Sequence, residues 1–153
     1  NTGDEIISDK HLSQEISIIS KFKNLFLILL GNVVQKFGNE LEKQQQILLS
    51  LSDILIEIYF SESALYRTLK NIDNQGIKSQ TTQENMVQFY VFEAYNIIHK
   101  SAREIILSIS DGKEQEQLLK ILNEKCSYNR HPNVIGLKTK IANKFIEENN
   151  YFI

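Results

Sequence analysis

The sequence predicts an all-α protein, an antiparallel up-and-down helical bundle of about four to five helices. Two observations favour this class. The 153 residues include one proline and six glycines, which is little punctuation for a fold of short strands and turns. Apolar residues also recur three and four positions apart over long stretches, the period of a helix with a buried face. We expect a linker or disordered tail over residues 1–8 and a single helical-bundle domain over residues 9–153.

The first two predicted helices are long. The first runs from about Asp9 to Phe37, and Gly38 suits the left-handed position that follows a helix end. The second runs from about Glu40 to Ile72. Besides its main apolar stripe, it carries further large apolar side chains at Ile47, Leu49, Ile54, Ile56, Tyr59 and Phe60. A helix that is apolar nearly all round should lie between neighbours.

Three further helices complete the prediction. The polar stretch 71–81, which contains Gly76, reads as a loop, and Thr82 with Glu84 in the first turn indicates a third helix that ends at Asp111. A fourth helix is expected over 113–126. Pro132 interrupts helical structure after it, and a last helix is expected over 134–149.

Charge and cysteine content exclude several classes. A net charge of −2, a pI near 6.0 and dispersed basic residues argue against a nucleic-acid partner. The single cysteine, Cys126, cannot form an internal disulfide, so we expect a reducing, cytoplasmic compartment. The polar start does not resemble a signal peptide, and the apolar run 25–31 is far shorter than the ~20 residues of a spanning helix. Because the chain begins with Asn1, we expect a fragment of a longer protein.

No motif for chemistry is visible. The three histidines lack the Glu-x-x-His spacing of di-metal bundles, and zinc-ligand pairs, phosphate-binding glycine loops and nucleophile elbows are missing. Asp53 and Glu57, four residues apart, fit a polar helix edge better than a general acid and base. We therefore predict no catalytic, cofactor-binding or metal-binding residue in this chain.

Polar residues among the apolar ones of the second and third helices suggest a structural role. Buried charges need partners, because an unpaired one costs several kcal/mol. We predict an interhelical polar cluster that fixes helix register, with Arg67 or Arg103 paired to Glu57 or Glu62 and with His99 nearby.

The segment Val34–Lys70 reads VQKFGNELEKQQQILLSLSDILIEIYFSESALYRTLK. Its amino-acid sequence resembles the C-terminal region of bacterial acyl-CoA dehydrogenases of the very-long-chain type. Phe92-Glu93-Ala94 and the ending from Leu137 to Glu148 extend the likeness. It covers most of the chain between about Lys21 and Phe152. In this family an extra helical domain follows the catalytic fold.

The resemblance implies that the parent protein is an FAD-dependent oxidoreductase of fatty-acid β-oxidation that removes the α and β hydrogens of an acyl-CoA thioester. A glutamate base, the flavin and an electron-transfer flavoprotein serve that reaction, and the family's catalytic parts lie upstream of the matched region. No glutamate here stands in the catalytic-base context, so this chain alone should be no enzyme. FAD belongs to the parent enzyme, with no cofactor in this chain.

The resemblance also implies partners. We expect an exposed apolar surface that docks to the catalytic domain of the same polypeptide or to a second subunit, in a full-length enzyme that is a homo-oligomer. A peripheral membrane contact is a less favoured use of that surface, because no basic, aromatic-rimmed helix is evident. Two other readings stay open: a free-standing helical adaptor that binds a partner protein, and an enzyme built on the polar cluster.

Overall fold

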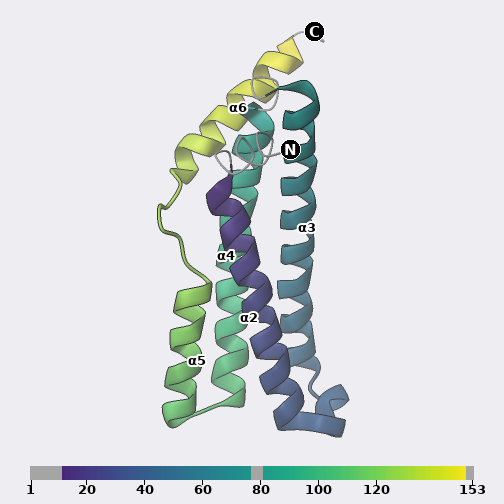
Figure 1. The fold of residues 1–153 in the computed structure, drawn as a ribbon, viewed down its shortest axis with the longest axis vertical. Helices are drawn as coiled ribbons and strands as arrows, with labels where there is room; N and C mark the ends of the chain where they lie inside the picture. The colour runs from purple at the N-terminus through teal and green to yellow at the C-terminus, as the bar shows by residue number, and fades with distance from the viewer. Residues whose placement is uncertain (1–11, 77–80, 151–153) are drawn as a thin grey trace.

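The chain forms a helical bundle in the computed structural model, which describes residues 12–76 and 81–150 (Figure 1). The predicted tail, residues 1–8, lies outside the described residues, as do the middle of the predicted 71–81 loop and the last three residues. The helices are α2 (Ser13–Phe37), the 3-10 helix η1 (Gly38–Lys43), α3 (Gln45–Gln75), α4 (Thr81–Ile109), α5 (Gly112–Lys125) and α6 (Val134–Asn150).

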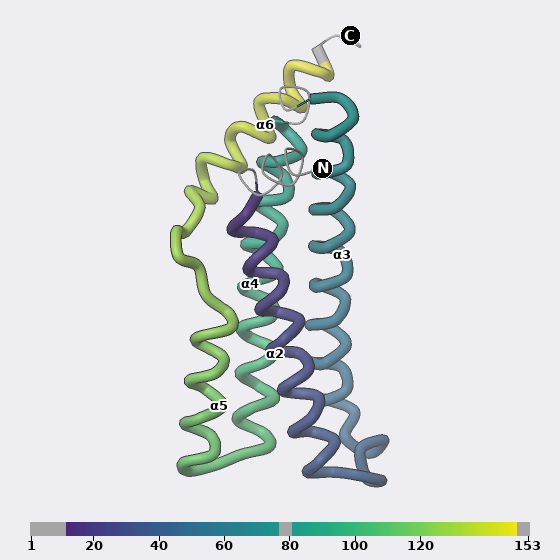
Figure 2. The backbone as a smooth tube through the Cα atoms, viewed as in Figure 1, coloured from purple at the N-terminus to yellow at the C-terminus, as the bar shows by residue number. Residues whose placement is uncertain are grey.

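The up-and-down arrangement is confirmed for α2 to α5, which alternate in direction (Figures 1 and 2). The last helix departs from it. After the connection that contains Pro132, α6 continues in the general direction of α5 and leans across the ends of α3 and α4. The central helix is α4, which packs against α2, α3, α5 and α6.

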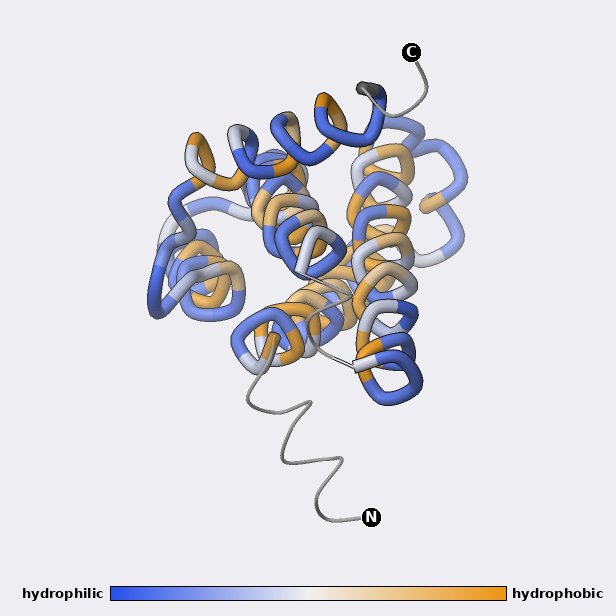
Figure 3. The backbone as a smooth tube through the Cα atoms, turned by 90° about the horizontal axis from the view of Figure 1, so that it is seen from above, coloured by the Kyte–Doolittle hydropathy of each residue, from blue (hydrophilic) through white to orange (hydrophobic). Residues whose placement is uncertain are grey.

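The apolar spacing of each helix explains its packing. In α2 the residues at intervals of three and four, Ile18, Phe22, Leu25, Leu29 and Val33, are all buried. In α4 the same spacing buries Val87, Val91, Ala94, Ile98 and Ala102. Seen down the bundle, apolar segments gather toward the centre and hydrophilic segments lie mostly outside (Figure 3). Large side chains buried in this way each contribute about 1.5–3 kcal/mol before entropy is counted.

The boundary between α2 and α3 differs from the prediction. Gly38 has a φ of 51° and its N–H donates to the carbonyl oxygen of Val34, which ends α2 as expected. The chain then makes the 3-10 turn η1 and a non-helical residue, Gln44, before α3 begins at Gln45. The predicted start at Glu40 is therefore too early. At the other end, α3 continues to Gln75, past the predicted Ile72, and ends at Gly76, whose φ is 89°.

Two contacts hold distant segments together. Lys36 of α2 donates from Nζ to the carbonyl oxygen of Ile109, the last residue of α4, at 2.7 Å. An ammonium group at a helix C-terminus also complements the helix dipole. Gln14 and Arg130 exchange two hydrogen bonds, from Nε2 to the Arg130 carbonyl at 3.0 Å and from the Arg130 N–H to Oε1 at 2.9 Å. The connection before α6 is thereby fixed to the start of α2.

The stretch Ser13–Lys43 contains an 18-residue window that is apolar enough to cross a membrane by length and composition, with a mean hydropathy of 1.5 over that window. The sequence expectation, which considered only the short run 25–31, underestimated it. Core helices of globular proteins meet the same criterion, and here Phe22 and Leu25 are completely buried against the bundle. We therefore describe α2 as a packed helix of the core.

Candidate docking surface

The side of α3 turned away from the bundle exposes large apolar side chains, with polar residues such as Asp53, Ser63 and Arg67 between them. The apolar side chains are Leu49, Leu55, Ile56, Tyr59, Phe60 and Tyr66, with exposed fractions between 48% and 66%, and we call this set the α3 outer face. The rings of Tyr59 and Phe60 meet edge to face at 5.5 Å between centroids. The prediction that this helix is apolar nearly all round is confirmed, but its neighbours α2 and α4 leave the outer face uncovered.

The α3 outer face continues into a groove beside α2. The groove has a volume of about 470 Å³, and its walls include Phe26 and Leu27 of α2 and Leu55, Tyr59 and Tyr66 of α3. Lys23 of α2 and Glu62 of α3 form an ion pair that also lines it. With charge paired and apolar side chains on both walls, the groove suits an apolar segment of protein better than a charged small molecule.

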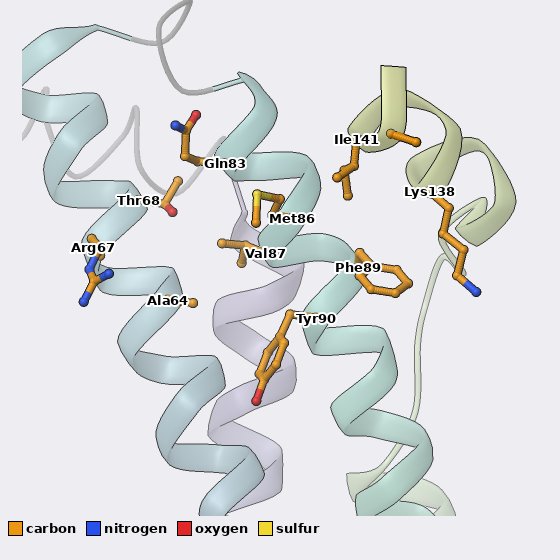
Figure 4. A pocket seen from close by; sticks show the side chains of 11 residues that line it. Ala64, Arg67, Thr68, Gln83, Met86, Val87, Phe89, Tyr90, Lys138 and Ile141 are labelled. Carbon is orange, nitrogen blue, oxygen red and sulfur yellow. The ribbon is translucent and has the colours of Figure 1, made fainter. Parts of the chain in front are cut away.

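A second cavity, of about 500 Å³, lies between α3, α4 and α6 (Figure 4). Val87, Met86 and Thr68 face its interior, and Ile141 of α6 lies opposite. Lys138 turns outward, with its Nζ 5.6 Å from the centroid of the Phe89 ring. Most of the described walls of this cavity are apolar, so it offers a place for apolar groups.

The structure distributes the five residues of the predicted polar cluster over several places. Glu62 pairs with Lys23 of α2 in place of an arginine. The Tyr90 hydroxyl donates to the Glu57 carboxylate. Arg67 is exposed at the edge of the α3–α4–α6 cavity. His99 and Arg103 share a separate shallow depression on α4.

The surroundings of Glu57, including its hydrogen bond with Tyr90, shift the pKa of its carboxyl group. Desolvation raises the pKa of this carboxyl, and the nearby Asp53 raises it further, while the hydrogen bond from Tyr90 works in the opposite direction. Burial and the negative charge of Glu57 in turn raise the pKa of Tyr90. The pair joins α3 to α4 through a partner, Tyr90, that was not predicted from the sequence, and that such contacts fix helix register stays a prediction.

Sequence reasoning missed a buried carboxyl, Glu15, near the start of α2. Its exposed fraction is 5%, and desolvation is the main reason that its pKa is raised. Tyr128, also buried, has a raised pKa through desolvation first and the charge of Glu15 second. A signal was present, because Glu15 stands three residues before Ile18 and seven before Phe22, on the apolar stripe.

Cys126 and the rings of Tyr95 and His131 pack beside Tyr128. The Cys126 thiol donates to the carbonyl oxygen of Tyr95 at 3.6 Å, and burial raises the pKa of the thiol to about 12. The ring of Tyr128 contacts those of Tyr95 and His131, at 5.1 and 5.5 Å between centroids. A thiol with a raised pKa is a poor nucleophile, so this cluster is structural.

No group of three or more histidine, cysteine, aspartate or glutamate side chains within 12–76 and 81–150 could hold a metal ion. We also assign no residue of this part of the chain to a flavin. That the chain itself carries no cofactor stays a prediction.

Comparisons with known proteins agree on one family. The family model described as "Acyl-CoA dehydrogenase, C-terminal domain" matches residues 21–124. A probable acyl-CoA dehydrogenase of Bacillus subtilis (strain 168) is 30% identical over 142 residues, which are 93% of this chain and 24% of that protein. The crystal structure of an acyl-CoA dehydrogenase from Bacillus anthracis, complexed with FAD, matches with a TM-score of 0.87 and 30% identity over 90% of this chain.

The match covers 24% of the Bacillus anthracis chain, so this sequence spans about a quarter of the length of both relatives. The very-long-chain subtype is not tested by these comparisons and stays a prediction. The bacterial relatives and the family model, which covers most of the bundle, agree with the resemblance of Val34–Lys70. The chain belongs to the family of acyl-CoA dehydrogenase C-terminal domains.

Proposed function

We propose that this chain is the C-terminal accessory domain of an FAD-dependent acyl-CoA dehydrogenase and serves structure and interaction. The parent enzyme oxidises acyl-CoA thioesters in fatty-acid β-oxidation, in the cytoplasm. Its flavin and its catalytic base lie outside this chain. The domain packs on the catalytic part of the same polypeptide or on a second subunit of a homo-oligomer.

The observation that carries the proposal is the fold match. Nearly the whole bundle superposes on a quarter of an acyl-CoA dehydrogenase that was crystallised with FAD. The organisation of the bundle supports an accessory role. Its buried polar side chains, such as Glu15 and Ser61, are enclosed by the core, and its two larger cavities have mainly apolar walls.

The free-standing adaptor is a weaker alternative. A groove with apolar walls can hold a partner helix, and the α2–α3 groove has that character. Membership of a family named for the C-terminal part of an enzyme nevertheless favours attachment to a catalytic domain.

The test is to purify the complete product of the gene that encodes this chain and to record its absorbance before and after acyl-CoA is added. We expect a flavin spectrum that bleaches as substrate reduces the cofactor, with oxidised acceptor restoring it. The chain alone, as a control, should be colourless. A gene product with no flavin, or with flavin that acyl-CoA does not reduce, would contradict the proposal.

A further inference from the structure

Packing among the described residues, 12–76 and 81–150, does not explain the exposed apolar side chains of the α3 outer face. Its six apolar side chains extend from Leu49 to Tyr66, about 25 Å of helix at a rise of 1.5 Å per residue. At about half exposure they offer on the order of 600 Å² of apolar surface. That is the upper end of the largest apolar patch on a typical monomer, and such patches often mark contact sites.

Position on the helix shows that the face is not a by-product of the core stripe. The buried residues of α3, such as Ile54, Ile58 and Leu65, lie on the side toward α2 and α4. Leu49, Ile56 and Phe60, at intervals of seven and four, form a second stripe on the opposite side. A helix with water on its outer side carries polar residues there, so a second apolar stripe indicates a second packing partner.

The ion pair between Glu62 and Lys23 reduces the cost of covering the α3 outer face with a protein partner. Glu62 lies on the border of the groove next to Tyr59 and Tyr66, and its carboxylate is paired with Lys23. An unpaired carboxylate there would cost several kcal/mol on docking, whereas a paired one lowers that penalty. Asp53 and Arg67 are exposed on the same side of α3, and protein interfaces combine such polar residues with apolar ones.

We propose that the α3 outer face, with the α2–α3 groove beside it, is the surface on which the catalytic part of the same polypeptide docks. This inference rests on the proposed function. The chain spans about a quarter of each relative, and the family is a C-terminal domain, so a large upstream part is covalently tethered to the bundle. A tethered partner has an effective concentration that a second molecule or a lipid surface does not match.

The test is hydroxyl-radical footprinting of the complete holoprotein, read by mass spectrometry as the oxidation rate of each aromatic side chain. Phe145 of α6, with an exposed fraction of 49%, is the internal control for Phe60, at 52%. If the catalytic part docks there, the oxidation rates of Tyr59, Phe60 and Tyr66 should be lower, by roughly fivefold or more, than the rates that their exposure in the bundle implies. The reason is that an interface core excludes water. Phe145 should react as its exposure implies.

Three results would overturn the inference. They are α3 aromatic rates that match exposure in the bundle, protection that disappears on dilution as for a second copy, and protection that appears only when anionic phospholipid vesicles are added. Flavin content and bleaching by acyl-CoA are recorded on the same sample. A sample that bleaches but lacks α3 protection contradicts only the docking surface, whereas a sample without flavin contradicts the proposed function.

Discussion

At the scale of single residues, buried polar groups set how the chain responds to pH and to reagents. Glu15, Tyr128 and Cys126 occupy one region where α2 meets the end of α5. Desolvation is the largest cause of the raised pKa of each. These groups stay neutral near neutral pH more readily than exposed ones do.

Replacement of Glu15 by Gln should stabilise the chain more as pH rises. The pKa of Glu15 is raised in the folded state. When the pH exceeds the ordinary pKa of a glutamate, the folded state therefore holds more protons than the unfolded state, and the stability of the fold decreases as pH rises. Glutamine cannot ionise and removes that fall. The Tm difference between Glu15→Gln and wild type should therefore be larger at about pH 7 than at about pH 3, where Glu15 is protonated in both the folded and the unfolded state.

Glu148→Gln, an exposed position of α6, is the matched control and should show the same small Tm difference at both pH values. The groups that face Glu15 and contribute to the local field are Glu84 and Tyr128. A Glu15→Gln effect that does not depend on pH would show that this carboxyl is solvated.

Cys126 should resist alkylation in the folded chain. Its thiol is 2% exposed and its pKa is raised to about 12, so the reactive thiolate is scarce at about pH 8 and out of reach. Labelling by a maleimide should follow the rate of unfolding. A Ser108→Cys variant adds an exposed thiol on α4 that should react at once. Equal labelling rates for the two thiols would contradict the burial.

At the scale of elements, spacing predicted the helices well because each buries a stripe. The last four begin and end within a few residues of their predicted bounds, apart from the start of α3. The start of α3 lies later than predicted because Glu40 and Leu41 belong to the 3-10 helix η1. The polar residues of η1 resemble those of the first turn of an α-helix, so the sequence does not distinguish the two. The direction of α6 was also beyond prediction, since it depends on the conformation of the connection around Pro132.

Side-chain partners were harder to predict than helices. The identity of Glu62 and Glu57 as residues that join helices could be inferred from their place among apolar positions. Their partners, Lys23 and Tyr90, depend on how far each helix is rotated and shifted along its neighbour. The amino-acid sequence alone does not show how neighbouring helices are rotated and shifted against each other.

Two neighbouring leucines of α2 test the packing of that element. Leu25 is completely buried and Leu27 is 64% exposed. Leu25→Ala should lower the free energy of unfolding by about 2–5 kcal/mol, because it removes buried methyl groups and leaves a cavity. Leu27→Ala should change it by less than about 0.5 kcal/mol. Chemical denaturation of the two variants measures both, and similar losses would place α2 in a different rotation.

At the scale of the whole molecule, the bundle has one helix, α3, with large apolar side chains on two sides. The core is complete around α4, yet α3 presents a second apolar side and a groove beside it. The relatives are about four times as long, and we propose that the rest of such a chain packs on that side. The segment Val34–Lys70, whose sequence resembles the family, also contains the α3 outer face. The segment that identifies the family is therefore also the segment proposed to form the interface.

The most direct test of the account places charge on the α3 outer face of the complete protein. In a Tyr59→Lys and Phe60→Lys double variant, both positions are exposed in the bundle, so the domain should still fold. Docking would bury the two ammonium groups without partners, at several kcal/mol each. The undocked population, read as the rate of limited proteolysis between the catalytic part and Leu12, should rise at least roughly tenfold, which is about 1.4 kcal/mol.

A Phe145→Lys and Ile146→Lys variant adds the same charge to exposed apolar positions of α6 and should cleave at the wild-type rate. The account predicts fast cleavage for the α3 variant alone. If the α3 variant and the α6 variant are cleaved at the same rate as wild type, the α3 outer face does not hold the domain on the enzyme.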